Sequence, residues 1–290
     1  MKQGTILINA YTQRESELYQ PKRLKEELEK LGVSVQIKRN ILPAGLADAN
    51  VVSEQFGDFC VYLDKDRYAG ALLEKTGLRL FNSAAAVAVC DDKMATFAAL
   101  AGEGIPFPDS YFAPLCYSDQ PVSTELLDGV AARLGYPLVV KTCYGSLGQG
   151  VFLAENREQL FALARKLQSV PHLFQKFVAS SKGRDVRVIV IGGEARVAML
   201  RTSNGDFRSN IELGGKGTPY EIDKTLKAVS EKVARVLKLD YCGIDMLFDG
   251  AGGYTVCEVN SNAFFGGMER VTGYPVAAEY AKYIVKVMYD

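Results

Sequence analysis

The chain has 290 residues, of which 48% are hydrophobic and 23% are charged, as in an ordinary globular protein. Lys and Arg together number 34, as do Asp and Glu, so the formal net charge is zero. This balance provides no overall attraction to nucleic acid or to an anionic membrane, and we expect neither as a partner. The length is sufficient for two or three small domains.

The cysteines indicate a reducing environment. There are six, with no CxxC pair and no metal-ligand spacing. The first residues are too polar for a signal peptide, and no apolar run approaches the ~20 residues of a membrane span. We therefore expect a soluble, cytoplasmic protein. His172 is the only histidine, which argues against zinc–histidine and Ser-His-Asp catalysis.

The first ninety residues predict an open, doubly wound α/β domain, because strand-like and helix-like segments alternate. Predicted strands cover 4–10, 33–38, 58–64 and 78–83, and predicted helices cover 14–32 and 68–77. Two short helices follow, broken near Cys90–Asp92, with Ser83 and Asp91 or Asp92 as their caps.

The remaining elements predict an antiparallel α+β organisation. In chain order they are a helix at 124–135, strands at 136–143 and 149–156, a helix at 157–168, a strand at 172–178, two strands between 183 and 203, a polar loop to about Tyr220, a helix at 222–239, a hairpin at 241–262 and a helix at 275–290.

The C-terminal hairpin carries polar residues where apolar ones are expected. Glu258 and Asn260 are two apart on a strand and share one face, and Asp245 lies on the partner strand. A six-residue turn places Asp245 opposite Glu258, whereas a five-residue turn displaces it by one. These oxygen ligands favour Mg²⁺ or Mn²⁺ over zinc. The alternative is a pair of carboxylates neutralised by nearby Lys or Arg.

A glycine-rich loop follows a predicted strand that ends near Lys141. Gly145, Gly148 and Gly150 allow backbone N–H groups to approach phosphate oxygens, and the lysine adds positive charge. The loop is neither a P-loop nor a GxGxxG motif. It is either a phosphate lid or a flexible hairpin tip.

A second charged face occurs on the strand that contains Asp185 and Arg187, whose opposite face is apolar. An odd-length turn around Gly192-Gly193 brings Arg201 of the paired strand to this face, and a two-residue turn separates it. The alternative is a solvated outer face. Arg208 and Asn210 follow in a loop suited to gripping a carboxylate or phosphate, or in a mobile surface loop.

In this order, the segments resemble the ATP-grasp superfamily and, within it, the RimK-like carboxylate–amine ligases. The resemblance rests on "CDDKMATFAAL", "PLVVKTCYGSLGQGV", "FQKFV", "GRDVRVIVIGGEARVAMLR", "GIDML" and "CEVNSN". It implies an ATP-grasp fold with an N-terminal pre-ATP-grasp α/β domain at 1–90 and two α+β subdomains, at 91–178 and 179–290, that sandwich ATP.

The resemblance also implies roles for individual residues. Arg187 and Arg201 act on the phosphoryl and acyl-phosphate groups, Asp185 lies on the ribose side, and Lys176 and Phe177 meet adenine through their backbone. The remaining ATP contacts are Lys93, Lys141, Gly145, Ser146, Gly148 and Gln175; the metal ligands are Asp245, Glu258 and Asn260; the candidate substrate contacts are Arg208, Asn210 and Asn262.

The implied activity is ATP-dependent amide-bond formation through an acyl phosphate, with ATP and Mg²⁺ (or Mn²⁺). The substrates are a small-molecule or peptide carboxylate and an amino acid such as glutamate, and a homo-oligomer is expected. The sequence departs from the family pattern after "RSN", where it reads "IELGGKG", and after "EVN", where it reads "SNAFFGG". Both departures concern the substrate side. A phosphotransferase and a non-catalytic ATP sensor are the alternatives.

Overall fold

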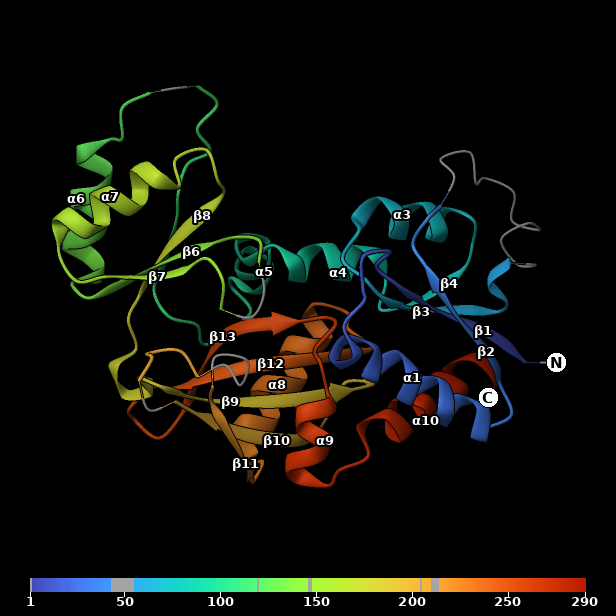
Figure 1. Cartoon of the computed structure of the whole chain (residues 1–290). Helices are drawn as coiled ribbons and strands as arrows, with labels where there is room; N and C mark the ends of the chain where they lie inside the picture. The colour runs from blue at the N-terminus through green and yellow to red at the C-terminus, as the bar shows by residue number, and fades with distance from the viewer. Residues whose placement is uncertain (1, 43–54, 119, 146–147, 204, 210–213) are drawn as a thin grey trace.

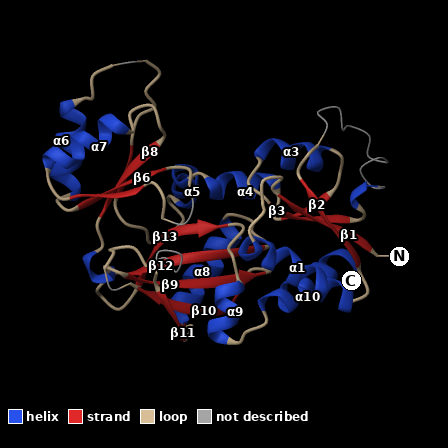
Figure 2. Cartoon of the chain, viewed as in Figure 1, coloured by secondary structure: helices blue, strands red, loops and turns tan. Residues whose placement is uncertain are grey.

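The computed structural model describes residues 2–42, 55–118, 120–145, 148–203, 205–209 and 214–290. Its strands form three sheets (Figures 1 and 2). No helix in these ranges is long and apolar enough to cross a membrane.

The N-terminal sheet is parallel, with the strand order β2-β1-β3-β4, as predicted for an open α/β unit. Its strands are β1 (Gln3–Ile8), β2 (Ser34–Arg39), β3 (Phe59–Leu63) and β4 (Arg79–Phe81). Ile6 and Ile8 pack on one face with α1 (Glu15–Lys30) and the C-terminal helix α10 (Val276–Tyr289). Leu7 packs on the other face with α3 (Arg67–Lys75) and α4 (Ala84–Asp91).

Two short helices connect this unit to the next sheet. Ser83 caps α4 and Asp92 caps α5 (Lys93–Leu100), each by accepting backbone N–H groups through its side chain. Both predicted caps are therefore present. The cap at Asp92 begins α5 at Lys93, and the Lys93 N–H also donates to the Cys143 carbonyl at 3.1 Å. These bonds place Lys93 beside the second sheet.

The second sheet is antiparallel, with the order β5-β8-β6-β7. Its strands are β5 (Ser110–Phe112), β6 (Leu138–Thr142), β7 (Val151–Ala154) and β8 (His172–Lys176). Helices α6 (Thr124–Leu134) and α7 (Arg157–Lys166) cover one face and share an apolar core with it. This core is separate from the others, and Figure 1 shows the unit standing apart from the rest of the molecule.

The third sheet is antiparallel, with the order β11-β10-β9-β12-β13, and follows a short 3-10 helix, η1 (Ala179–Ser181). Its strands are β9 (Arg184–Ile191), β10 (Glu194–Thr202), β11 (Lys216–Tyr220), β12 (Tyr241–Phe248) and β13 (Tyr254–Asn260). Helix α8 (Lys224–Val236) packs on the face that carries Val186, Val188 and Val190.

The opposite face of the third sheet joins the N-terminal unit. Ile189, Ile191 and Tyr241 share one core with α1 and α10. Two elements here differ from the sequence prediction: the predicted loop before Tyr220 contains β11, which pairs with β10, and α9 (Gly266–Thr272) precedes the last helix. The domain boundaries at 90 and 178 remain predictions.

Candidate active site

A β-bulge places Arg201 opposite Asp185. The turn at Gly192-Gly193 has two residues, since Ile191 pairs with Glu194, and such a turn alone was expected to separate the two side chains. The register then shifts between Ala195 and Val197, which makes Arg196 an extra residue. The prediction from turn length was wrong because it assumed a regular ladder.

A second bulge places Glu258 opposite Asp245. The turn between Phe248 and Tyr254 has five residues, the length that was expected to displace the two carboxylates. The register shifts between Asp245 and Met246, so that Cys257 is the extra residue on β13 and Asp245 pairs with Glu258. Bulges of this kind occur often beside active sites, where they redirect a side chain.

These registers assemble a buried network of four charges. Arg201 donates from Nε and Nη2 to Asp185 at 2.7 and 2.6 Å, and Arg187 donates to both oxygens of Asp245 at 2.7 Å. Arg201 Nη2 also lies 2.9 Å from Asp245 Oδ2. Arg201 is 2% exposed and Asp185 is 7% exposed, so this is not a solvated outer face.

The network holds Asp245 in its ionised form. Burial alone raises the pKa of this carboxyl, but the charges and hydrogen bonds of Arg187 and Arg201 outweigh burial and bring the pKa to about 2. The structure pairs Asp245 with two guanidinium groups, which is the neutralisation by Lys or Arg given above as the alternative to a metal site.

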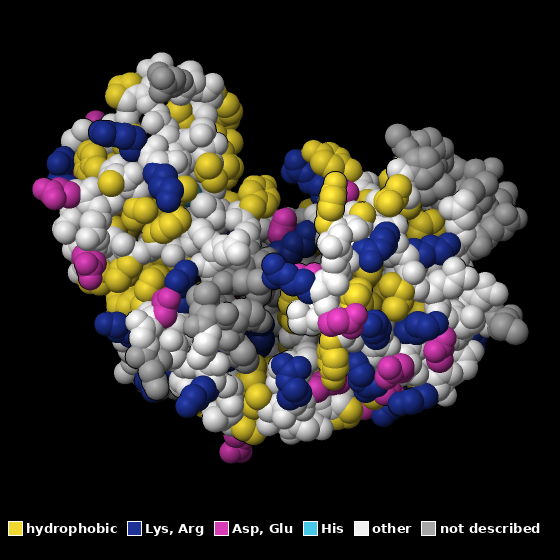
Figure 3. Space-filling model, viewed as in Figure 1, with side chains coloured by type: hydrophobic (Ala, Val, Ile, Leu, Met, Phe, Trp, Pro, Cys, Tyr) yellow, Lys and Arg dark blue, Asp and Glu magenta, His cyan; other side chains and the backbone are white. Residues whose placement is uncertain are grey.

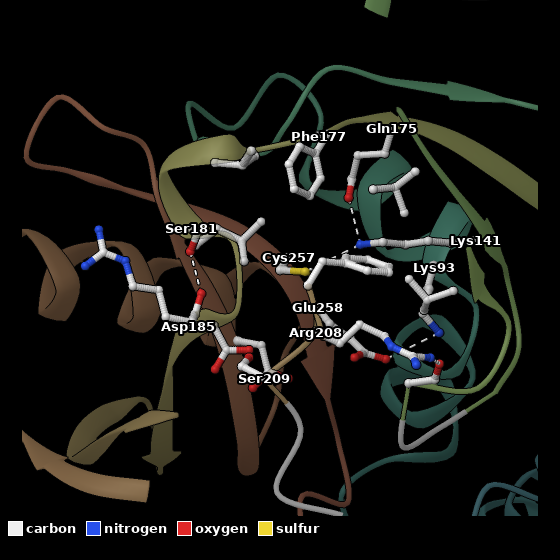
Figure 4. A pocket seen from close by; sticks show the side chains of 18 of the residues that line it. Lys93, Lys141, Gln175, Phe177, Ser181, Asp185, Arg208, Ser209, Cys257 and Glu258 are labelled. Atoms are coloured by element: carbon white, nitrogen blue, oxygen red, sulfur yellow. Dashed lines mark hydrogen bonds and ion pairs between the residues drawn. The ribbon is translucent and has the colours of Figure 1, made fainter. Parts of the chain in front are cut away.

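Glu258 is neutralised by a lysine from another unit. Lys93 Nζ lies 3.3 Å from Glu258 Oε1 and 3.3 Å from the Gly145 carbonyl (Figure 4). The two aspartates that precede Lys93 in the sequence have other partners: Asp91 pairs with Lys65 at 2.7 Å and Asp92 caps α5. Lys93 therefore connects β13 to the glycine loop.

Lys141 reaches the same space from β6. Its Nζ donates to Gln175 Oε1 at 2.7 Å and lies 3.4 Å from Cys257 Sγ. Gln175 in turn donates to Ser110 Oγ at 2.9 Å, which fixes its orientation. Figure 4 shows the ends of Lys93, Lys141, Arg208 and Glu258 directed toward a common space. We call this space the lysine cleft.

Most of the predicted catalytic, nucleotide, metal and substrate residues line the lysine cleft. They are Lys93, Lys141, Gly145, Gly148, Gln175, Lys176, Phe177, Asp185, Arg201, Arg208, Asp245 and Glu258. Apolar walls come from Val139, Val151 and Leu247. The apolar walls suit a flat nucleotide base, and the lysines suit a chain of phosphate groups.

Two residues of the cleft have partners that the sequence did not indicate. The Lys176 N–H donates to the Asp109 carbonyl at 2.8 Å, so this N–H is not available to adenine. Arg208, expected to grip substrate, donates to Asp206 and, through Nη1, to the Gly148 carbonyl at 2.8 Å. It therefore holds the glycine loop against the third sheet.

A second, larger cavity lies between α1 and β13, and we call it the α1–β13 cavity. Its volume is about 530 Å³, against about 100 Å³ for the lysine cleft. Its lining includes Asn9, Gln20, Asp64, Arg187, Glu258, Asn260 and Asn262. Glu258 lines both spaces, so the two meet at this residue. The space-filling view in Figure 3 shows the notch between the two lobes of the molecule.

Asn262 was predicted to contact substrate and lies in this cavity. Its Nδ2 donates to the Asp64 carbonyl at 2.7 Å, so its amide nitrogen joins the C-terminal segment to the N-terminal unit. Ser146 and Asn210, predicted to contact phosphate and substrate, lie outside the described residues.

Sequence reasoning assigned no site residue to the N-terminal unit. In the structure, Asn9 directly follows β1, Asp64 directly follows β3, and both residues line the α1–β13 cavity. Asp64 is 8% exposed and accepts hydrogen bonds from Asn9, Asn40 and the Lys65 N–H. The predicted parallel sheet could have indicated these two residues, because ligands of open α/β sheets bind at the carboxyl ends of the strands.

The oxygen ligands of the predicted metal site are of the type that a hard cation prefers. Asp245, Glu258 and the Asn260 amide share one face of β12 and β13, and carboxylate and amide oxygens suit Mg²⁺. In the described part of the chain, no three His, Cys, Asp or Glu side chains gather as a metal site. A metal held here would therefore rely on the Asn260 oxygen and on ligand phosphates in addition to the carboxylates.

Fold and site together define a protein class in which the second and third sheets border a lysine-lined cleft. Residues 90–284 match the family model of the RimK-like ATP-grasp domain. The chain therefore belongs to the RimK-like ATP-grasp family, as the sequence predicted.

Three curated relatives are 33% to 38% identical to the chain over their matched lengths. It is 38% identical over 218 residues to N-acetylaspartylglutamate synthase A of Mus musculus, covering 74% of this chain and 56% of that protein. It is also 38% identical over 218 residues to β-citrylglutamate synthase B of Danio rerio, covering 74% of this chain and 53% of that protein. A probable alpha-L-glutamate ligase of Maridesulfovibrio salexigens is 33% identical over 216 residues, covering 73% of this chain and 69% of that protein. The chain thus spans about half the length of the first two.

Solved structures share the fold. D-Alanine–D-alanine ligase from Bacillus anthracis, complexed with ATP, superimposes with a TM-score of 0.75 and 16% identity, covering 99% of this chain and 97% of that one. A RimK domain ATP-grasp protein from Sphaerobacter thermophilus gives a TM-score of 0.72 and 23% identity, covering 97% of this chain and 98% of that one. The predicted ATP-grasp fold is confirmed.

Proposed function

We propose that the chain is an ATP-dependent carboxylate–amine ligase that forms an amide bond through an acyl phosphate. One observation carries the proposal: Glu258 lines both the lysine cleft and the larger α1–β13 cavity. A phosphoryl donor in the first space and a carboxylate in the second therefore meet at one point. This is the arrangement that transfer of a phosphoryl group onto a carboxylate requires.

The chemistry divides between the two spaces. The acceptor carboxylate attacks the γ-phosphorus of ATP, the bond to ADP breaks, and an acyl phosphate forms. The amine then attacks the acyl carbon, loses a proton, and phosphate leaves with one of the former carboxylate oxygens. The second step must exclude water, which competes with the amine for the acyl phosphate.

The described side chains suit these steps without histidine. Phosphoryl transfer needs charge neutralisation and alignment, and Lys93 and Lys141 bring positive charge to the cleft from α5 and β6. Gln175 orients Lys141. Arg187 and Arg201 would stabilise negative charge on the transferred phosphoryl and on the tetrahedral oxyanion, with Asp185 and Asp245 fixing their orientation.

Two further elements support closure and metal binding. Asp245, Glu258 and Asn260 would hold Mg²⁺, which when bound neutralises phosphate charge and polarises the transferred group. Arg208 holds the Gly148 carbonyl, and Lys93 lies beside the Gly145 carbonyl, so both ends of the glycine loop rest against the cleft. We propose that this loop excludes water during the reaction.

The names of the relatives suggest the substrates. Two are synthases of products that contain glutamate joined to N-acetylaspartate or to citrate. We propose glutamate as the amine and a small polycarboxylic acid as the acceptor. We propose the cytoplasm as the location of the reaction; the six cysteines, all free thiols, support this proposal.

The test is ADP release by the purified protein with Mg-ATP and a panel of acids, with and without glutamate. We expect ADP only when both an acid and glutamate are present, and an amide product by mass spectrometry in equal amount. The panel contains N-acetylaspartate and citrate. ADP release that needs an acceptor but no amine would replace the ligase with a phosphotransferase.

A further inference from the structure

Two buried amide nitrogen atoms lack partners, and both belong to residues that line the same cavity. Among the described residues, the buried side-chain nitrogen atoms without a hydrogen-bond partner are Gln20 Nε2 and Asn260 Nδ2. Both residues line the α1–β13 cavity. Gln20 is 3% exposed, so water does not solvate its amide freely. Buried polar groups in native proteins are almost always satisfied, so an exception requires an explanation, and a bound partner is one.

Helix α1 is irregular at the same place. It contains Pro21, which has no N–H, so the helical hydrogen bond from residue 21 to the Glu17 carbonyl cannot form. Gln20 and Pro21 are three and four residues after Glu17, and all three residues line the cavity. One face of α1 therefore combines an unpaired amide with an interrupted helical ladder, a poor arrangement for the helix alone.

The opposite wall of the cavity carries the proposed chemistry. Arg187 and Asn260, on β9 and β13, line the same space, and so does Glu258 where it meets the lysine cleft. A substrate whose reacting end lies at Glu258 extends toward α1. The terminal torsion of a glutamine side chain has a broad energy profile, so rotation about this bond would bring the Gln20 N–H to the cavity without moving the helix.

We propose that Gln20 determines substrate specificity by donating a hydrogen bond from Nε2 to a carboxylate oxygen of the substrate. This inference rests on the proposed function, which supplies two sources of such a carboxylate: the acceptor acid and the amino acid. Gln20 binds the end of the substrate away from the bond that forms. It is therefore a recognition residue and takes no part in phosphoryl transfer.

The proposal predicts opposite effects on stability and on binding. Gln20→Met keeps the length of the side chain and removes its donors, so no unpaired N–H remains buried. We expect the melting temperature of the free variant to equal or exceed that of the wild type. Binding of one acid should weaken about tenfold to a hundredfold, the range for loss of a hydrogen bond to a charged group.

Calorimetric titration with citrate, N-acetylaspartate and glutamate, in the presence of Mg²⁺ and a non-hydrolysable ATP analogue, measures the effect directly. Weaker binding of citrate or N-acetylaspartate alone assigns Gln20 to the acceptor, and weaker binding of glutamate alone assigns it to the amino acid. Gln36→Met is the matched control, because Gln36 is exposed on β2 and should change neither quantity. Equal affinities in Gln20→Met and wild type overturn the proposal, as does failure of the wild type to bind any of the three acids.

Gln20→Glu gives a second readout that a purely structural role would not produce. The introduced carboxylate repels a substrate carboxylate at neutral pH, and its protonation at lower pH restores an O–H donor. We expect the dissociation constant of the affected acid to fall toward the wild-type value as pH decreases, and a pH-independent constant overturns the proposal. Binding measured this way does not depend on turnover, so failure of the ligase assay leaves the Gln20 result readable.

Discussion

Arg201 lies directly opposite Asp185 on the neighbouring strand and joins it through two hydrogen bonds of 2.7 and 2.6 Å. The same guanidinium reaches Asp245 at 2.9 Å, so one buried arginine holds two carboxylates. Its orientation depends on the extra residue at Arg196. The proposed catalytic arginine is therefore also a structural element of the third sheet.

Replacing Arg201 tests this structural role. Arg201→Met leaves Asp185 without its bidentate partner and removes one of the two cations at Asp245. Because removing one partner leaves a buried charge uncompensated, we expect the free energy of unfolding to fall by about 3–5 kcal/mol. Urea denaturation measures the change. Arg157→Met is the control: Arg157 pairs with Asp128 on the surface, and its loss should have little effect. Equal losses in both variants would contradict a buried network.

Lys141 should act on ATP and not on the other substrates. Lys141→Met removes the charge that Gln175 orients in the cleft. Loss of a hydrogen bond to a charged group predicts a rise of about tenfold to a hundredfold in the KM for ATP, with the KM for glutamate unchanged. Steady-state kinetics with each substrate varied in turn separates the two. Lys227→Met, on the exposed face of α8, should match the wild type. A rise in the KM for glutamate alone would remove Lys141 from the ATP site.

Gly150 should tolerate no side chain. Its φ is +74°, and a Cβ there would lie 2.1 Å from Thr142 Oγ1, which donates to the Tyr144 carbonyl. Gly252 has a similar φ of +93° but open space around it. Gly252→Ala therefore measures the backbone strain alone, about 1–2 kcal/mol, and Gly150→Ala should lose more stability because the loop must also shift. Equal losses in thermal unfolding would show that the overlap is relieved without strain.

His172 should make stability depend on pH. Burial lowers its pKa below 6.5, and its Nδ1 lies 2.8 Å from the Val170 carbonyl. Between the folded and unfolded pKa values the unfolded chain binds more protons, so stability is fully present above about pH 6.5 and falls as pH decreases through the folded pKa.

His172→Asn tests this because it retains an N–H donor but does not titrate. The wild type should lose stability relative to the variant as pH decreases from about 6.5 toward the folded pKa, with a slope of at most about 1.4 kcal/mol per pH unit. Chemical denaturation at each pH gives the difference. Parallel curves for the two proteins would show that His172 does not contribute.

The sequence predicted the fold because the pattern of each element matches its packing. Alternating strands and helices over the first ninety residues indicated a parallel sheet, and the apolar face at Val186, Val188 and Val190 packs on α8. β11 was missed because Gly217 and Pro219 weaken the strand pattern. α9 was missed because it is one short helix that begins with two glycines.

The site was less predictable than the fold. The described candidate residues all line one of the two spaces, but their partners depend on strand register. Neither bulge leaves a sequence signal, since Arg196 and Cys257 are ordinary strand residues, and a one-residue shift moves every later side chain to the other face. The candidate role of Gln20 was missed for another reason: a glutamine on an amphipathic helix is usually a surface residue.

The most direct test of the ligase follows one oxygen atom. With an acceptor acid labelled with ¹⁸O in its carboxylates, an acyl phosphate passes one labelled oxygen to phosphate for each amide formed. We therefore expect singly labelled inorganic phosphate in equal amount to ADP, measured by mass spectrometry. Unlabelled phosphate, or a phosphoryl group retained on the acceptor, would contradict an acyl-phosphate ligase.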